Sequence, residues 1–80
     1  MISLPIKALV FIYTKAGTAF KVVEKVKEIE GVKEAYAVTG EFDVVAKVEV
    51  ADLKELGEKV VNKIHGIEGV VRTVTSIVVE

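Results

Sequence analysis

Cysteine and tryptophan are absent from this sequence of 80 residues, and it contains a single histidine, His65. Without cysteine the chain can form neither a disulfide nor a thiolate metal site. One histidine supplies only one of the ligands that a metal ion needs, and it has no cysteine nucleophile to pair with. We therefore expect no metal, no cofactor and no enzyme activity. His65 is predicted to face solvent near the end of a helix.

An excess of charge of one sign and a long hydrophobic run are also missing. The chain has 11 basic and 12 acidic residues and a net charge of −1, which is not the basic footprint of a nucleic-acid-binding protein. The longest apolar run, residues 8–13, is far shorter than the roughly 18 residues that span a bilayer. Residues 1–5 lack the features of a signal peptide. We expect a cytoplasmic protein that binds neither nucleic acid directly nor a membrane.

Hydrophobic residues are abundant by contrast, at 51% of the chain. A domain of this size buries only about 60% of the surface that its unfolded chain exposes. The remaining apolar surface can be buried by self-association, so we expect an oligomer. Plentiful Val, Glu and Lys, with a single Asn, also indicate a thermophilic source.

An internal repeat is the most informative feature. The tetrapeptide Ile-Glu-Gly-Val at residues 29–32 recurs 38 positions later, at residues 67–70. Each half predicts a strand, an amphipathic helix, a Gly-Val turn and a second strand. The first half has a strand over residues 7–13, a helix capped by Thr18 with an apolar stripe to Ile29, and a strand over 33–39.

The second half follows a short hairpin at residues 40–42. Its first strand covers residues 43–50, and Asp52 with Glu55 resembles a capping box at the start of a helix whose apolar stripe ends at Ile64. The last strand covers residues 70–79. Two βαβ units joined in this way predict one α+β domain over residues 1–80, with a ferredoxin-like βαββαβ fold. Its four-stranded antiparallel sheet has the first and third strands at the centre and both helices on one face.

The first strand is apolar on both of its faces, although two helices can cover only one face of the sheet. A second copy that packs sheet to sheet would cover the other. We therefore predict a homodimer in the form of a dimeric α/β barrel, which assembles into a higher oligomer.

The hairpin Thr39-Gly40-Glu41-Phe42-Asp43 is the first candidate site. Gly40 allows backbone amides to approach a ligand closely, and Asp43 offers a carboxylate to an ammonium group. The alternative interpretation is a plain turn, in which Gly40 takes a positive φ and Asp43 caps its own backbone.

Thr73 and Thr75 are the second candidate. They lie two residues apart, so their hydroxyls project from one face of the last strand and could bind a carboxylate or an amide. The alternative interpretation is ordinary β-propensity with cross-strand hydroxyl pairs.

Taken together, the pattern resembles the ligand-binding (RAM) domain of Lrp/AsnC-type transcription regulators from about residue 6 to the end. Four pieces in order carry the resemblance: the strand 7–13 followed by Gly17, Gly31-Val32 leading to residues 35–40, the Gly-x-x-Asp motif at 40–43, and the closing segment 69–75. Members of the family carry a helix-turn-helix before this domain, and residues 1–6 offer none, so the chain resembles a stand-alone form.

The resemblance implies dimers that join into rings and amino-acid effectors bound between dimers beside the hairpin. By position it points to Thr39, Gly40, Asp43, Thr73 and Thr75. The leading hypothesis is an oligomeric amino-acid-binding module that acts alone or as a co-regulator of full-length Lrp/AsnC regulators. Two alternatives stay open: a dimeric ferredoxin-like enzyme of the monooxygenase or isomerase kind, which needs a polar pocket between sheet and helices, and a purely structural assembly unit.

Overall fold

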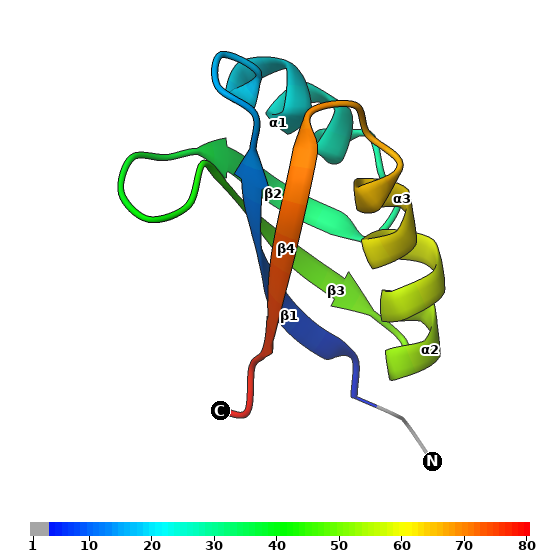
Figure 1. Cartoon of the computed structure of the whole chain (residues 1–80). Helices are drawn as coiled ribbons and strands as arrows, with labels where there is room; N and C mark the ends of the chain where they lie inside the picture. The colour runs from blue at the N-terminus through cyan, green and yellow to red at the C-terminus, as the bar shows by residue number, and fades with distance from the viewer. Residues whose placement is uncertain (1–3) are drawn as a thin grey trace.

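The computed structural model describes residues 4–80, so the first three residues of the expected 1–80 domain lie outside the described part. Four strands form one antiparallel sheet in the order β2-β3-β1-β4, with β1 and β3 at the centre. Both helical segments lie on one side of this sheet (Figure 1). The predicted α+β, ferredoxin-like fold is therefore confirmed. The elements in chain order are β1 (Ile6–Thr14), α1 (Ala19–Lys27), β2 (Val32–Ala37), β3 (Val44–Val50), α2 (Leu53–Glu55), η1 (Leu56–Val61), α3 (Asn62–His65) and β4 (Val70–Ile77).

The second helical segment begins with the predicted cap. Asp52 Oδ1 accepts a hydrogen bond from the Glu55 amide at 2.8 Å, and Glu55 Oε1 accepts one from the Ala51 amide at 3.1 Å. The middle turn, η1, is a π-helix, which the sequence did not predict. The apolar residues Leu56, Val60 and Ile64 are all buried, and their spacing of four fits either helix type. No helix in residues 4–80 is long and apolar enough to cross a membrane.

The prediction that the Thr18 side chain caps α1 is wrong. Thr18 occupies the N-cap position, but its side chain makes no capping hydrogen bond. Its hydroxyl instead donates to the carbonyl oxygen of Lys15 at 2.7 Å, and the Lys15 amide donates to the Gly69 carbonyl oxygen at 2.8 Å. Thr18 therefore helps to close the turn that joins β1 to α1, and Lys15 joins this turn to the one before β4.

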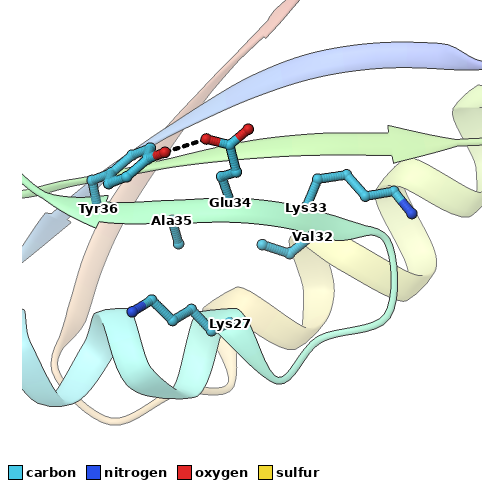
Figure 2. Close-up of a pocket in the computed structure, with 6 residues that line it drawn as sticks. All are labelled: Lys27, Val32, Lys33, Glu34, Ala35 and Tyr36. Carbon is cyan, nitrogen blue, oxygen red and sulfur yellow. Dashed lines mark hydrogen bonds between the residues drawn. The ribbon is translucent and has the colours of Figure 1, made fainter.

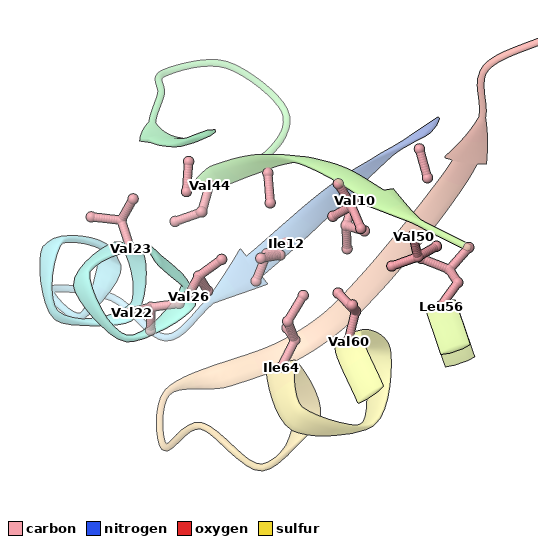
Figure 3. Packing of buried hydrophobic residues seen from close by; sticks show 14 residues of the cluster. Val10, Ile12, Val22, Val23, Val26, Val44, Val50, Leu56, Val60 and Ile64 are labelled. Atoms are coloured by element: carbon pink, nitrogen blue, oxygen red, sulfur yellow. The ribbon is translucent and has the colours of Figure 1, made fainter. Parts of the chain in front are cut away.

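The hydrophobic core fills the space between the helices and one face of the sheet (Figure 3). Every buried side chain in residues 4–80 is apolar. The enzyme alternative requires a polar pocket in this layer, so the core gives it no support. The largest fully buried side chains are Ile12, Ile64, Val10, Val22, Val26, Val44 and Val60.

The opposite face of the sheet carries no helix in the described chain (Figure 1). Alternate residues of β1, namely Leu9, Phe11 and Tyr13, point to this face and are only half-buried. We call it the open face. The apolar strip along its central strand is the surface through which we predict that two copies pack sheet to sheet.

Candidate functional site

The β2–β3 hairpin projects beyond the sheet (Figure 1). The Val38 amide donates to the Asp43 carbonyl oxygen at 2.9 Å, and the Asp43 amide donates to the Ile12 carbonyl oxygen at 3.1 Å. Gly40 has a φ of +110°, and a Cβ built there would meet nothing within 4 Å. The predicted positive φ is confirmed. The backbone at Gly40 is therefore open to anything that approaches from solvent.

Asp43 ties the hairpin to the end of the central strand. Its Oδ2 accepts a hydrogen bond from the Thr14 amide at 2.8 Å, and the residue is half-buried. Within residues 4–80, Oδ1 takes part in no hydrogen bond. One carboxylate oxygen thus ties the hairpin to β1, whereas the turn interpretation predicts a cap on the backbone of Asp43 itself. Within the described chain, the other oxygen is free of such a bond.

Phe42 turns back from the hairpin onto the open face. Its ring stacks on Phe11, with centroids 4.3 Å apart, and meets the Tyr13 ring edge-on at 5.7 Å. The Tyr13 hydroxyl donates to Glu41 Oε2 at 3.3 Å. The guanidinium of Arg72 lies over the Tyr13 ring, with its Cζ atom 4.4 Å from the ring centroid.

These neighbours of the hairpin were missed by sequence reasoning. The position of Phe42 between Gly40 and Asp43 is a signal that could have placed an aromatic ring in the site. Arg72 could be found only from strand pairing, because it reaches the Tyr13 ring through its register with Tyr13 across β1 and β4.

Thr73 and Thr75 lie apart from the hairpin. They pair with Ile12 and Val10, both buried in the core, so their side chains point to the helix side of the edge strand β4. His65, exposed as expected, places Nε2 2.9 Å from the Thr73 hydroxyl. Within one chain, the structure brings Thr39, Gly40 and Asp43 together and leaves the two threonines on the opposite face from Arg72.

A hollow of about 400 Å³ runs along the free edge of β2, lined by Lys27 and Val32 to Tyr36 (Figure 2). The Tyr36 hydroxyl donates to the Glu34 carboxylate, and Lys47 Nζ lies 3.3 Å from Glu34 Oε2. The Tyr36 hydrogen bond and, next, Lys47 hold the pKa of the Glu34 carboxyl below its usual range. Glu34 raises the pKa of Tyr36 in turn. None of the predicted site residues lines this hollow.

Comparison with known proteins gives consistent matches. The family model described as the Lrp/AsnC ligand binding domain matches residues 7–80. An uncharacterized HTH-type transcriptional regulator of Pyrococcus furiosus is 40% identical over 75% of this chain, and the homocitrate synthase of Sulfurisphaera tokodaii is 35% identical over 86% of it. The chain spans 40% of the length of the regulator and 14% of the synthase.

Solved structures share the fold. The protein TTHA0845 of Thermus thermophilus superimposes with a TM-score of 0.87 at 36% identity, with 94% of each chain covered. E. coli AsnC gives the same TM-score at 25% identity, with 98% of this chain and 53% of AsnC covered. A transcriptional regulator of Neisseria meningitidis, solved in complex with L-Met, shares the fold with a TM-score of 0.82 at 21% identity, over 98% of this chain and 52% of that one. The Pyrococcus and Thermus relatives agree with the thermophilic composition.

Proposed function

The chain belongs to the Lrp/AsnC ligand-binding domain family, and on this premise we propose that it binds a free amino acid beside the β2–β3 hairpin as part of an oligomer. The observation that carries the proposal is the hairpin itself. Gly40 presents open backbone, and Asp43 keeps one carboxylate oxygen without a hydrogen-bond partner in residues 4–80. A carboxylate at the edge of solvent can hold an ammonium group by a charge-assisted hydrogen bond.

The mixture of relatives favours ligand binding as the common property. An HTH-type transcriptional regulator and a homocitrate synthase share this segment, although it makes up only 40% of one and 14% of the other. A small domain that is useful to both is best explained by the binding of a small molecule that reports on metabolism. Such a role would place the protein in the cytoplasm, and mixed assembly with full-length regulators would let it modify their response.

The oligomer is needed to complete the site. Thr73 and Thr75 lie on the helix side of β4, so they can reach a hairpin only when a neighbouring copy brings its own β4 to it. Thr39, Gly40 and Asp43 would come from one chain and the threonines from another. This arrangement keeps all five residues in the proposed site and places the ligand between copies.

A thermal-shift screen against the twenty amino acids tests the proposal, with L-methionine among the first probes. A ligand that binds only the folded state stabilises it by RT ln(1 + [L]/Kd), so a millimolar site gives a clear shift at tens of millimolar ligand. Asp43→Asn is the matched variant, because its amide oxygen can still accept from the Thr14 amide while the negative charge is removed. We expect a shift with wild type that the variant loses. If none of the twenty amino acids stabilises the wild type, the proposal fails.

A further inference from the structure

We propose that the helix over residues 53–65 is a two-state switch, in which Leu53 replaces Leu56 in the core when the π-helical turn η1 becomes α-helical. The switch lies in the helix layer and does not depend on amino-acid binding at the hairpin. We call the arrangement in the structure the π-register and the alternative arrangement the α-register.

The hydrogen bonding of η1 produces the π-register. The Asn62 amide donates to the carbonyl oxygen of Gly57, five residues back, whereas an α-helix uses the residue four back. A π-helical turn therefore holds more residues than an α-helical turn. Each residue of an α-helix turns the chain by about 100°, so conversion of η1 to an α-helix rotates the residues before it by about that angle.

The two leucines of this helix lie in unequal environments. Leu56 is 5% exposed and points toward the sheet, as do Val60 and Ile64 (Figure 3). Leu53 is 61% exposed. In an unbroken α-helix, Leu53 would lie about 20° around the axis from Ile64, and Leu56 about 80° from it. The α-register therefore places Leu53 at the centre of the buried face and moves Leu56 to its margin.

The exchange leaves the composition of the core nearly unchanged. One leucine replaces another, so the apolar area that each register removes from water is similar. Gly57 would lie about 20° from Ile64 in the α-register, on the buried face, where its hydrogen atom takes little space. In the π-register a Cβ on Gly57 meets nothing within 4 Å. A large side chain at this position is therefore compatible with the π-register alone.

The first half of the repeat offers a comparison within the same chain. Residues 19–27, which form α1, correspond to residues 57–65 at the offset of 38, and α1 is α-helical throughout. It buries both Val22 and Val23, whereas of their equivalents Val60 and Val61 only Val60 is buried. An α-helix at this place in each half is thus compatible with the sheet that it covers.

The exchange also changes a hollow of about 330 Å³ at the start of the helix, lined by Pro5, Lys33, Glu49, Val50, Ala51 and Glu55. Glu55 is the helix residue among them and lies between the two leucines, so the rotation moves this wall of the hollow. A molecule that fills the hollow better in one register would shift the helix toward that register, because it can bias an equilibrium only by its difference in affinity.

Thiol labelling of single-cysteine variants tests the switch, because the chain has no cysteine of its own. Leu56→Cys reports the α-register, and Ile64→Cys reports global unfolding, since position 64 stays buried in both registers. Gly57→Glu is added to each to block the α-register. Asn62→Glu is the matched control, because it adds the same charge at an exposed position. A circular dichroism melt establishes that each variant is folded, and Val60→Cys replaces Ile64→Cys if the latter is not.

We expect Leu56→Cys to react at least about tenfold faster than Ile64→Cys, because a local change of register is more frequent than global unfolding. Gly57→Glu should lower the ratio of the two rates toward one, and Asn62→Glu should leave it unchanged. A ratio near one without the glutamate would contradict the switch. So would a ratio that Gly57→Glu does not lower, as fraying of the helix start predicts, or one that both glutamates lower equally.

Discussion

Asp43 has a structural contact and a proposed functional one, and the two can be separated by choice of substitution. Its Oδ2 accepts from the Thr14 amide at 2.8 Å in a half-buried setting. The sequence suggests two alternative roles for Asp43, in the turn or in ligand binding. The two oxygens of one carboxylate can serve both roles.

Asp43→Ala should lower the free energy of unfolding by about 1–2 kcal/mol, because the Thr14 amide loses its acceptor. Asp43→Asn should lower it by less than about half that amount, since an amide oxygen can take the same hydrogen bond. Urea denaturation of the three proteins measures both effects. Equal losses in the two variants would show that the negative charge, and not the hydrogen bond, stabilises the hairpin.

Glu34 and Tyr36 titrate as a pair on the open face. The pKa of Glu34 lies below its ordinary value of 4.5, so the folded state favours the ionised carboxylate. Its contribution to stability is present above the unfolded pKa and is lost as pH falls through the folded one. The pKa of Tyr36 lies above its ordinary value of 10.0, so its contribution is present below that value and is lost as pH rises through the folded pKa.

Tyr36→Phe should therefore raise the pKa of the Glu34 carboxyl toward 4.5, because the hydrogen bond from the tyrosine is the main cause of the lowering. Carbon-detected NMR titration of the glutamate carboxyls measures this. Glu34→Gln should in turn lower the pKa of Tyr36, measured by tyrosinate absorbance. A Glu34 midpoint that does not move in Tyr36→Phe would assign the whole effect to Lys47.

At the scale of elements, the order of the strands and helices and the pairing of the strands were predictable from the sequence, whereas the π-helical turn η1 was not. Apolar periodicity and the 38-residue repeat locate them, and Asp52 with Glu55 marks the start of the second helix. Contacts between distant elements were not predictable. The stacking of Arg72 on Tyr13, the return of Phe42 onto Phe11 and the bond between His65 and Thr73 depend on the sheet register and on the path of a loop, which leave no local pattern.

The turns next to the helices depend on steric space as well as on backbone conformation. Gly17 and Gly69 both have positive φ, at +80° and +103°. A Cβ on Gly17 would meet nothing within 4 Å, whereas one on Gly69 would lie 2.9 Å from the Thr18 hydroxyl oxygen. That hydroxyl is held by its hydrogen bond to the Lys15 carbonyl oxygen, so it cannot move aside without losing that bond.

Gly17→Ala should cost about 1–2 kcal/mol of stability, from the left-handed backbone alone. Gly69→Ala should cost at least about 1 kcal/mol more, because it adds the steric overlap with Thr18. Guanidinium denaturation of both variants gives the difference. Equal costs would mean that the turn before β4 relaxes freely around the added methyl group.

At the scale of the whole molecule, we expect the open face to determine the state of assembly. Its central strand places Leu9, Phe11 and Tyr13 there, all half-buried with no covering layer in the described chain. The helices already occupy the other face, so a second sheet is the cover that the chain itself can provide. We expect no monomer at micromolar concentration.

Phe11→Asp should shift the protein toward the monomer, since it places a charge in the middle of the proposed interface. Phe20→Asp is the matched control: Phe20 is 79% exposed on α1, away from the open face, and its substitution should leave assembly unchanged. Sedimentation velocity measures both. A wild-type species of 8.7 kDa, or equal dissociation in the two variants, would contradict the role of the open face.

The two repeat-related glycines have a consequence for how the chain folds. A Cβ on Gly31 would lie 3.3 Å from Val60, and one on Gly69 would lie 3.2 Å from Val22. Gly31 and Gly69 are 38 positions apart, and so are Val22 and Val60, so each half of the chain closes its turn against the helix of the other half. The turn of each half packs against a side chain of the other half, so we expect the two halves to fold cooperatively. The geometry is the one that two copies of a half-length chain would adopt about a twofold axis, as expected for a protein that arose by duplication.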